Sequence, residues 1–226
     1  MPNFKIEQSS LIYRWTFNRM LPGLPGPGTA AFATLCKGLH PYGISPSEII
    51  LDATSARLSE VSLAMNLLKG RLSIRMTFGW AEFSVRNLLD EDVPDLLKIA
   101  EAVASTLGEI DDQVGHGTVQ IAYRAHLSLS TLRAEEFLNS YLRLDSNRPE
   151  LVPDGFAYKV NVNGNVVDGQ ETRLVGTRSL VFKDALYVDL SMDRVTSGDP
   201  LAPGRGLDGD IERFLLLLDL KPDIND

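Results

Sequence analysis

The sequence predicts an α+β fold in which one unit of strands and helices occurs twice. Two observations support this prediction: both halves show the same order of elements, and three short segments of the first half return in the second. The repeated segments are Tyr13-Arg14 with Tyr123-Arg124, residues 80–85 with 187–192, and residues 90–97 with 208–215. Because the copies follow in the same order at similar spacing, we expect a duplicated architecture.

The first half begins with alternating apolar and polar residues over 10–18, which is typical of a half-buried strand. Residues 22–28, PGLPGPG, predict a loop because proline lacks a backbone donor and glycine resists ordering. A helix is expected over 29–39, followed by consecutive antiparallel strands between 48 and 89. The next helix has Asp92 as its expected N-cap and one apolar stripe.

The second half repeats this plan. The expected elements are a strand over 118–129, a helix over 132–142, a strand over 156–162 with a turn at Asn163-Gly164, strands over 171–182 and 186–193, and a helix over 209–218. Residues 196–206 predict a loop. The last helix contains the run FLLLL, which must be covered by the sheet or by a partner.

Each half, residues 1–110 and 111–226, therefore reads as strand, helix, three or four antiparallel strands, helix. We expect one compact, pseudo-symmetric unit with a curved antiparallel sheet and helices on one face. This element order resembles that of helix-grip folds and of saddle-shaped tandem repeats such as the TATA-binding-protein fold. No diagnostic motif accompanies the resemblance, so it implies no activity and no site residues.

Composition excludes several classes of protein. The chain has 226 residues, 44% of them hydrophobic, and its net charge of −8 disfavours a nucleic-acid partner. Cys36 is the single cysteine, so a disulfide scaffold is excluded and a cytoplasmic location is expected. No apolar run of membrane-spanning length and no export signal occurs, so we expect no membrane association.

Seven residues form the candidate ligand-binding surface: Arg14, Arg124, Glu82, Asp189, His126, Trp80 and Tyr187. If a twofold axis relates the halves, the two arginines and the two carboxylates are symmetry mates. Strand alternation then places them with His126 on the face opposite the helices. The alternative interpretation is that these charges form cross-strand salt bridges on a solvated sheet face.

No catalytic or metal-binding motif occurs. His40, His116 and His126 lie far apart in the sequence, and we expect no metal and no cofactor. Gly115-His116-Gly117 is a candidate for holding the backbone close to a ligand, but a turn is by far the better explanation of the segment. The pair Asp111-Asp112 is attributed to solubility.

The preferred functional interpretation is a non-enzymatic module that binds a protein, a peptide or a small molecule. The alternative is an enzyme in which Arg14 or Arg124 holds an anionic group and Glu82, Asp189 or His126 acts as base. A third interpretation is a structural subunit that forms homo-oligomers through its sheet edges or its apolar last helix.

Overall fold

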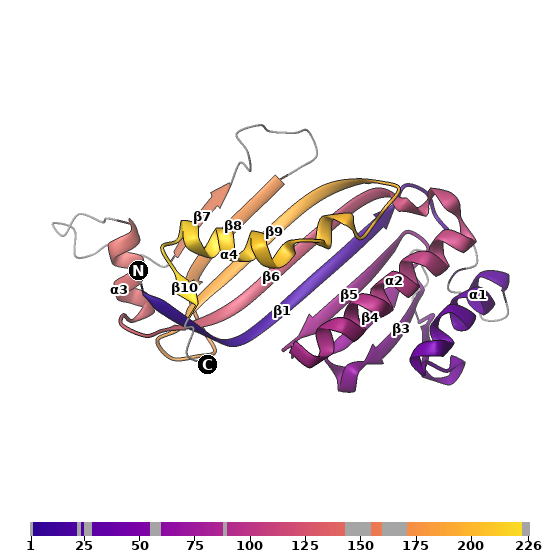
Figure 1. The fold of residues 1–226 in the computed structure, drawn as a ribbon, viewed down its shortest axis with the longest axis horizontal. Helices are drawn as coiled ribbons and strands as arrows, with labels where there is room; N and C mark the ends of the chain where they lie inside the picture. Colours follow the sequence, from indigo (N-terminus) through magenta and orange to yellow (C-terminus); the bar gives the residue numbers. More distant parts are fainter. Residues whose placement is uncertain are drawn as a thin grey trace. The chain divides into compact units, whose positions relative to one another are not determined.

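The computed structural model of the chain describes residues 2–21, 24, 29–54, 60–87, 90–142, 155–159 and 171–222. In these ranges the fold is α+β, with four α-helices and an open antiparallel sheet of ten strands (Figure 1). The strand order is β2-β3-β4-β5-β1-β6-β9-β8-β7, and β10 pairs with the start of β1 in parallel. The predicted fold class and antiparallel sheet are therefore confirmed.

Most elements lie close to their predicted positions. The strands are β1 (Asn3–Phe17), β2 (Ile50–Asp52), β3 (Ser62–Leu67), β4 (Leu72–Met76), β5 (Trp80–Arg86), β6 (His116–Leu129), β7 (Gly155–Lys159), β8 (Glu171–Arg178), β9 (Leu186–Ser197) and β10 (Lys221–Pro222). The helices are α1 (Ala30–Leu39), α2 (Val93–Ile110), α3 (Ala134–Leu142) and α4 (Leu207–Leu217). The predicted turn at Asn163-Gly164 lies outside the described residues.

The chain forms two compact units. Unit 1 comprises residues 1–10, 122–192 and 206–226, and unit 2 comprises residues 11–121 and 193–205. The long strands β1, β6 and β9 each contribute residues to both units. The division of the sequence into repeats at residue 110 remains a prediction.

Unit 2 contains the meander β2-β3-β4-β5, in which each strand pairs antiparallel with the next. Its strands alternate between buried apolar and more exposed polar residues, as the sequence pattern predicts. Helix α2 lies along this sheet with α1 packed beside it (Figure 1). The buried side chains of this core include Trp15, Leu35, Leu39, Leu63, Met65, Leu72, Ile74, Met76, Phe83, Ile99, Val103 and Leu107.

Unit 1 contains the antiparallel pair β7-β8 together with α3 and α4. Helix α3 packs against β8, and the unit buries Leu127, Phe137, Leu138, Phe156, Leu174, Leu186, Val188 and Leu190. The FLLLL run of α4 is covered only in part. Phe214 and Leu215 are buried, whereas Leu216 and Leu217 are 47% and 53% exposed, because consecutive helical residues point about 100° apart.

The register between β1 and β6 changes by one residue along β1. The Ser130 N–H donates to the Asn3 carbonyl oxygen (2.9 Å), and the Asn18 N–H donates to the His116 carbonyl oxygen (3.2 Å). Fifteen positions separate Asn3 from Asn18, but only fourteen separate His116 from Ser130. One extra residue on one strand of an antiparallel pair is a β-bulge, so β1 contains a bulge.

Burial along β1 changes phase accordingly. Phe4 is buried at an even position, whereas Tyr13, Trp15 and Phe17 are buried at odd positions. In a regular strand, residues at even and odd positions point to opposite faces of the sheet. The burial pattern changes from even to odd positions after Phe4 and before Tyr13, so we place the extra residue between these two. The bulge explains why alternation predicted a strand only over 10–18, although β1 begins at Asn3.

Helix α2 has the predicted N-cap residue but not the capping hydrogen bond expected of it. Asp92 occupies the N-cap position, but its side chain makes no capping hydrogen bond. Its carboxylate instead accepts hydrogen bonds from Arg71 Nε (2.7 Å) and Nη2 (2.8 Å). The bidentate guanidinium thus engages both carboxylate oxygens. Of the helices in the described part of the chain, none is long and apolar enough to cross a membrane.

The Gly115-His116-Gly117 segment is explained by close backbone packing. A Cβ atom at Gly117 would collide with the Thr16 carbonyl oxygen, and one at Gly115 would collide with the Gly198 carbonyl group. Both glycines are therefore required by neighbouring backbone within unit 2.

Candidate functional site

A salt bridge joins β1 and β5 on the polar side of unit 2. Arg14 Nε donates to Glu82 Oε2 at 2.7 Å, and Arg14 Nη2 lies 2.5 Å from the same oxygen. The Arg14 guanidinium also lies over the Trp80 ring, 4.8 Å from its centroid. Arg75 approaches the same ring at 6.0 Å and donates from Nε to Ser62 Oγ at 2.9 Å. Trp80 therefore packs with two guanidinium groups.

The strand register places this pair. The Phe17 N–H donates to the Gly79 carbonyl oxygen at 2.8 Å, and three positions along each antiparallel strand lead to Arg14 and Glu82. The two side chains are thus directly opposite one another. Each lies between buried apolar neighbours in its strand, so alternation directs both to the polar side.

Unit 1 contains a second cross-strand pair, between β6 and β9. Arg124 Nε donates to Asp189 Oδ2 at 3.0 Å, and the Tyr187 hydroxyl lies 3.5 Å from the same oxygen. The His126 ring lies 5.0 Å from the Tyr187 ring and 5.2 Å from the Phe182 ring. Burial, followed by the nearby Asp189 carboxylate, raises the pKa of Tyr187, so its phenol stays protonated at neutral pH.

The seven predicted residues thus fall into two groups, each within one unit. Unit 2 holds Arg14, Glu82 and Trp80 together, and unit 1 holds the remaining four together. Both arginines form the cross-strand salt bridges that the alternative interpretation expects. The Arg14 and Arg124 side chains remain 43% and 44% exposed, so part of each arginine is still accessible to solvent.

His126 is held by the turn between β8 and β9. Its Nδ1 lies 2.8 Å from Ser179 Oγ, the first residue after β8. The same oxygen accepts hydrogen bonds from the Val181 N–H (3.1 Å) and the Phe182 N–H (2.9 Å). Burial lowers the pKa of His126 below its ordinary value of 6.5, so its ring is neutral at neutral pH.

A pocket of about 400 Å³ opens in unit 1 where β6 leads into α3. Its polar lining consists of three hydroxyls, two cations and two carboxylates: Ser128, Ser130, Thr131, Arg133, Lys183, Glu136 and Asp184. The Glu136 carboxylate accepts a hydrogen bond from the Arg133 N–H at 3.0 Å. None of the seven predicted site residues lines this pocket.

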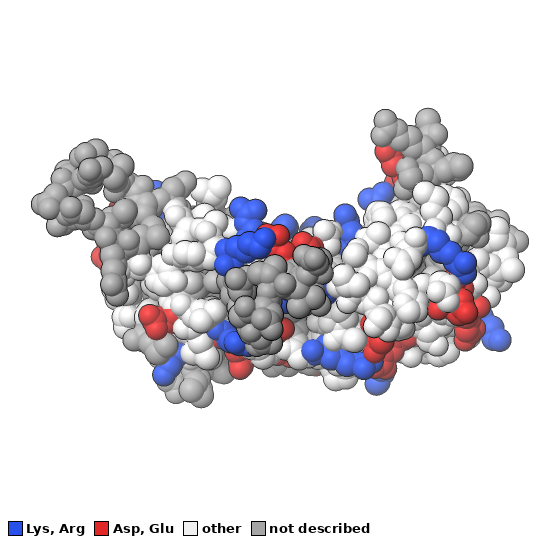
Figure 2. All heavy atoms as spheres, turned by 90° about the horizontal axis from the view of Figure 1, so that it is seen from above, with Lys and Arg blue, Asp and Glu red and all other residues white. Residues whose placement is uncertain are grey.

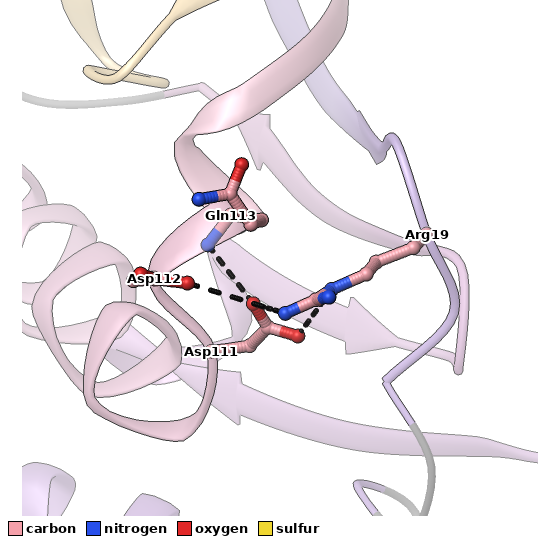
Figure 3. A network of polar contacts seen from close by, with 4 residues as sticks. All are labelled: Arg19, Asp111, Asp112 and Gln113. Carbon is pink, nitrogen blue, oxygen red and sulfur yellow. Dashed lines mark hydrogen bonds and ion pairs between the residues drawn. The ribbon is translucent and has the colours of Figure 1, made fainter.

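A third polar network lies within unit 2, between the segment after β1 and the end of α2 (Figure 3). Arg19 donates from Nε and Nη2 to the two carboxylate oxygens of Asp111, at 2.6 Å and 2.5 Å. Asp111 Oδ1 also accepts a hydrogen bond from the Gln113 N–H at 2.9 Å. The hydrogen bond from Arg19 lowers the pKa of Asp111.

This network corrects the solubility explanation for Asp111. The Asp111 side chain is only 13% exposed and is fixed by Arg19, whereas the Asp112 side chain is 86% exposed. The explanation therefore fits Asp112 alone. An arginine ninety-two positions earlier in the sequence gives no local signal that the two residues will meet.

Sequence patterns also missed three residues that contact the predicted ones. Arg75 belongs to the group in unit 2, and Ser179 and Phe182 belong to the group in unit 1. Arg75 lies on the polar side of β4, and alternation predicts that side but not the contact with Trp80. Ser179 and Phe182 lie in a turn, where periodicity predicts no side-chain direction.

Charges of both signs are interspersed on the face of the molecule seen in Figure 2. Within the described ranges, no three His, Cys, Asp or Glu side chains lie close enough together to hold a metal ion. No protein-family model matches the sequence, and no curated protein is significantly similar to it.

Proposed function

We propose that this chain is a non-enzymatic binding protein whose polar sheet face in unit 1 holds a peptide or a protein segment. The observation that carries the proposal is the mixed surface of that unit. The half-exposed Arg124–Asp189 pair adjoins the rings of Tyr187 and His126. Peptide recognition uses such combinations of aromatic anchors and groups that hydrogen-bond the backbone.

The turn beside this face adds exposed apolar side chains. Leu180 is 101% exposed and Val181 is 69% exposed, while Phe182 packs against His126. Neighbouring exposed apolar side chains that are rimmed by polar groups can form part of an interaction surface. They supply an apolar contact in the same turn as Ser179 and Phe182, which contact His126.

Binding is favoured over catalysis by the partners of the charged groups. Glu82 and Asp189 each accept a hydrogen bond from an arginine, and the neighbour of His126 Nδ1 is a serine already bonded to two N–H groups. An enzyme needs a base that can reach a substrate in a shared pocket. The pocket beside α3 is lined by other residues.

We further propose that the polar faces of the two units are copies of one ancestral face. In support, β1 and β6 each precede a helix, and each pairs with the strand that leads to the last helix of its half, β5 before α2 and β9 before α4. Arg14 faces Glu82 in the first pair, and Arg124 faces Asp189 in the second. An experimental structure in which Arg14 and Arg124 do not superpose when the halves are aligned would contradict the duplication.

The binding proposal is tested with a displayed library of random peptides selected on the chain of 226 residues. Selected peptides are measured by calorimetry against wild type, Arg124→Ala, the double variant Leu180→Ser/Val181→Ser, and Leu97→Ser. Leu97 is a matched control because it is an exposed leucine, at 58%, on α2 of unit 2. We expect affinity to fall at least tenfold in the first two variants and to remain unchanged in the third.

Selection of no peptide, or binding that is equally strong in all four proteins, would contradict the proposed site. Thermal unfolding of each variant provides the folding control, because a variant that melts like wild type has lost affinity for local reasons.

A further inference from the structure

The Ser179 hydroxyl is fully used by its three neighbours. A serine oxygen has two acceptor positions and one proton to donate. The Val181 and Phe182 N–H groups occupy the two acceptor positions, at 3.1 Å and 2.9 Å. The remaining neighbour is His126 Nδ1 at 2.8 Å, which must therefore accept the hydroxyl proton.

This count assigns the state of the imidazole. If Nδ1 accepts a proton from Ser179, the neutral ring carries its own proton on Nε2. A doubly protonated ring would place a donor on Nδ1 against an oxygen that already accepts two hydrogen bonds. One of the two turn N–H groups must then leave Ser179.

We propose that His126 is a pH-sensitive latch on the β8–β9 turn: neutral His126 holds Ser179 in place as the acceptor for the turn, and protonated His126 displaces a turn N–H from it. Protonation takes one proton from solvent onto Nδ1 and turns the Ser179 hydroxyl proton away. The element that responds is the segment from Ser179 to Ala185, which is closed by the Ser179 N–H donating to the Ala185 carbonyl oxygen at 2.8 Å.

Several charged or titratable groups surround this contact. They are Arg124 on β6, Tyr187 and Asp189 on β9, Lys183 and Asp184 in the turn, Arg178 at the end of β8, and Glu7 on the neighbouring strand β1. Arg124 and Asp189 pair with each other, and Arg178 lies 3.5 Å from Glu135. Burial is the cause that lowers the pKa of His126, in agreement with a ring held neutral.

The latch has a consequence for the apolar end of the turn. Leu180 and Val181 lie between Ser179 and Phe182, and their side chains are already exposed. Loss of a turn hydrogen bond releases the backbone that fixes these two side chains, so acidification changes how they are presented. This response does not require the proposed binding function.

The test is an NMR titration of the whole 226-residue chain, labelled with ¹⁵N, between pH 8 and pH 5. At pH 8 we expect the Nε2–H tautomer of His126. As the ring protonates, the solvent-exchange rate of the Val181 or the Phe182 amide, corrected for its intrinsic pH dependence, is expected to rise roughly two- to twelvefold, as for loss of one hydrogen bond. The midpoint of this rise should match the titration of the ring.

Two variants isolate the mechanism. In His126→Gln the two amide exchange rates should stay constant over the same range, because the side chain cannot be protonated. Ser179→Thr keeps the hydroxyl and should preserve the coupling, whereas Ser179→Ala should leave both amides fast at every pH. An Nδ1–H tautomer at pH 8 would overturn the proposal. So would wild-type amide rates that remain constant while His126 titrates.

Discussion

At the scale of single residues, the Tyr13 hydroxyl fixes the segment that follows β9. It donates to the Pro200 carbonyl oxygen at 2.5 Å inside unit 2. Burial is the main cause that raises the pKa of Tyr13, so the phenol remains a donor throughout the neutral range. Tyr13 and Arg14 therefore point to opposite faces of β1. The tyrosine side chain is buried in the core, and the arginine side chain binds Glu82.

Tyr13→Phe removes this donor and keeps the ring. We expect the free energy of unfolding to fall by about 0.5–1.5 kcal/mol, since a buried hydrogen bond is lost. The measurement is a urea titration followed by circular dichroism. Tyr42→Phe is the control, because that tyrosine is 40% exposed, and it should unfold like wild type.

His126 gives a second prediction at this scale, concerning stability and pH. Its pKa is lowered in the folded state from the ordinary value of 6.5, so the unfolded chain binds the proton more readily. The contribution of neutral His126 to the free energy of unfolding should therefore be fully present above pH 6.5. It should be lost as the pH falls from 6.5 through the pKa of His126 in the folded state. Urea titrations at pH 7.5, 6.5 and 5.5 measure this loss. His126→Gln should reduce it, and an unchanged slope would contradict the assignment to His126.

At the scale of elements, glycines decide how closely strands and helices pack. Gly117 lies in β6 against the Thr16 carbonyl oxygen, whereas Gly209 lies in α4 with open space where a Cβ would be added. The same substitution should therefore have opposite effects at the two positions.

Gly117→Ala is expected to destabilise the protein by about 1–3 kcal/mol, because the added methyl group forces β6 away from β1. Gly209→Ala is expected to stabilise it by about 0.5–1 kcal/mol, because alanine favours the helix and meets no neighbour. Thermal and urea unfolding of the two single variants provide the comparison. Equal effects of the same sign would show that the backbone contact at Gly117 is unimportant.

The elements themselves were largely predictable, because periodicity is local. Alternation and helical stripes located the long strands and α2, and the polar side of β1 and β5 followed from the same pattern. Contacts that depend on register were not predictable. The pairing of Arg71 with Asp92 and that of Arg19 with Asp111 join distant residues, and no local pattern encodes them.

At the scale of the whole molecule, β1 belongs to both compact units and contains one residue more than its partner requires. Deletion of Ser10 shortens the segment between Phe4 and Tyr13 by one residue and so restores the count of a regular strand. With one residue fewer, Phe4 and the set Tyr13, Trp15 and Phe17 could no longer be buried at the same time. Either Phe4 or this aromatic set would then point away from its core. We expect a loss of about 3 kcal/mol or more, comparable to truncating one buried phenylalanine. Ser10→Ala keeps the residue count and should be nearly neutral in the same unfolding measurement.

The bulge also sets a rule for recognising relatives of this chain. Between Phe4 and Tyr13 the spacing is nine positions, an odd number, although both side chains are buried in one strand. A relative that keeps this architecture can gain or lose residues between these two positions only in pairs. Insertion or deletion of one residue would turn the side chains at one end of β1 to the opposite face of the sheet. Suppose that related sequences keep the flanking aromatic and apolar residues but show odd and even spacings between them equally often. The bulge would then not be a conserved feature of this strand.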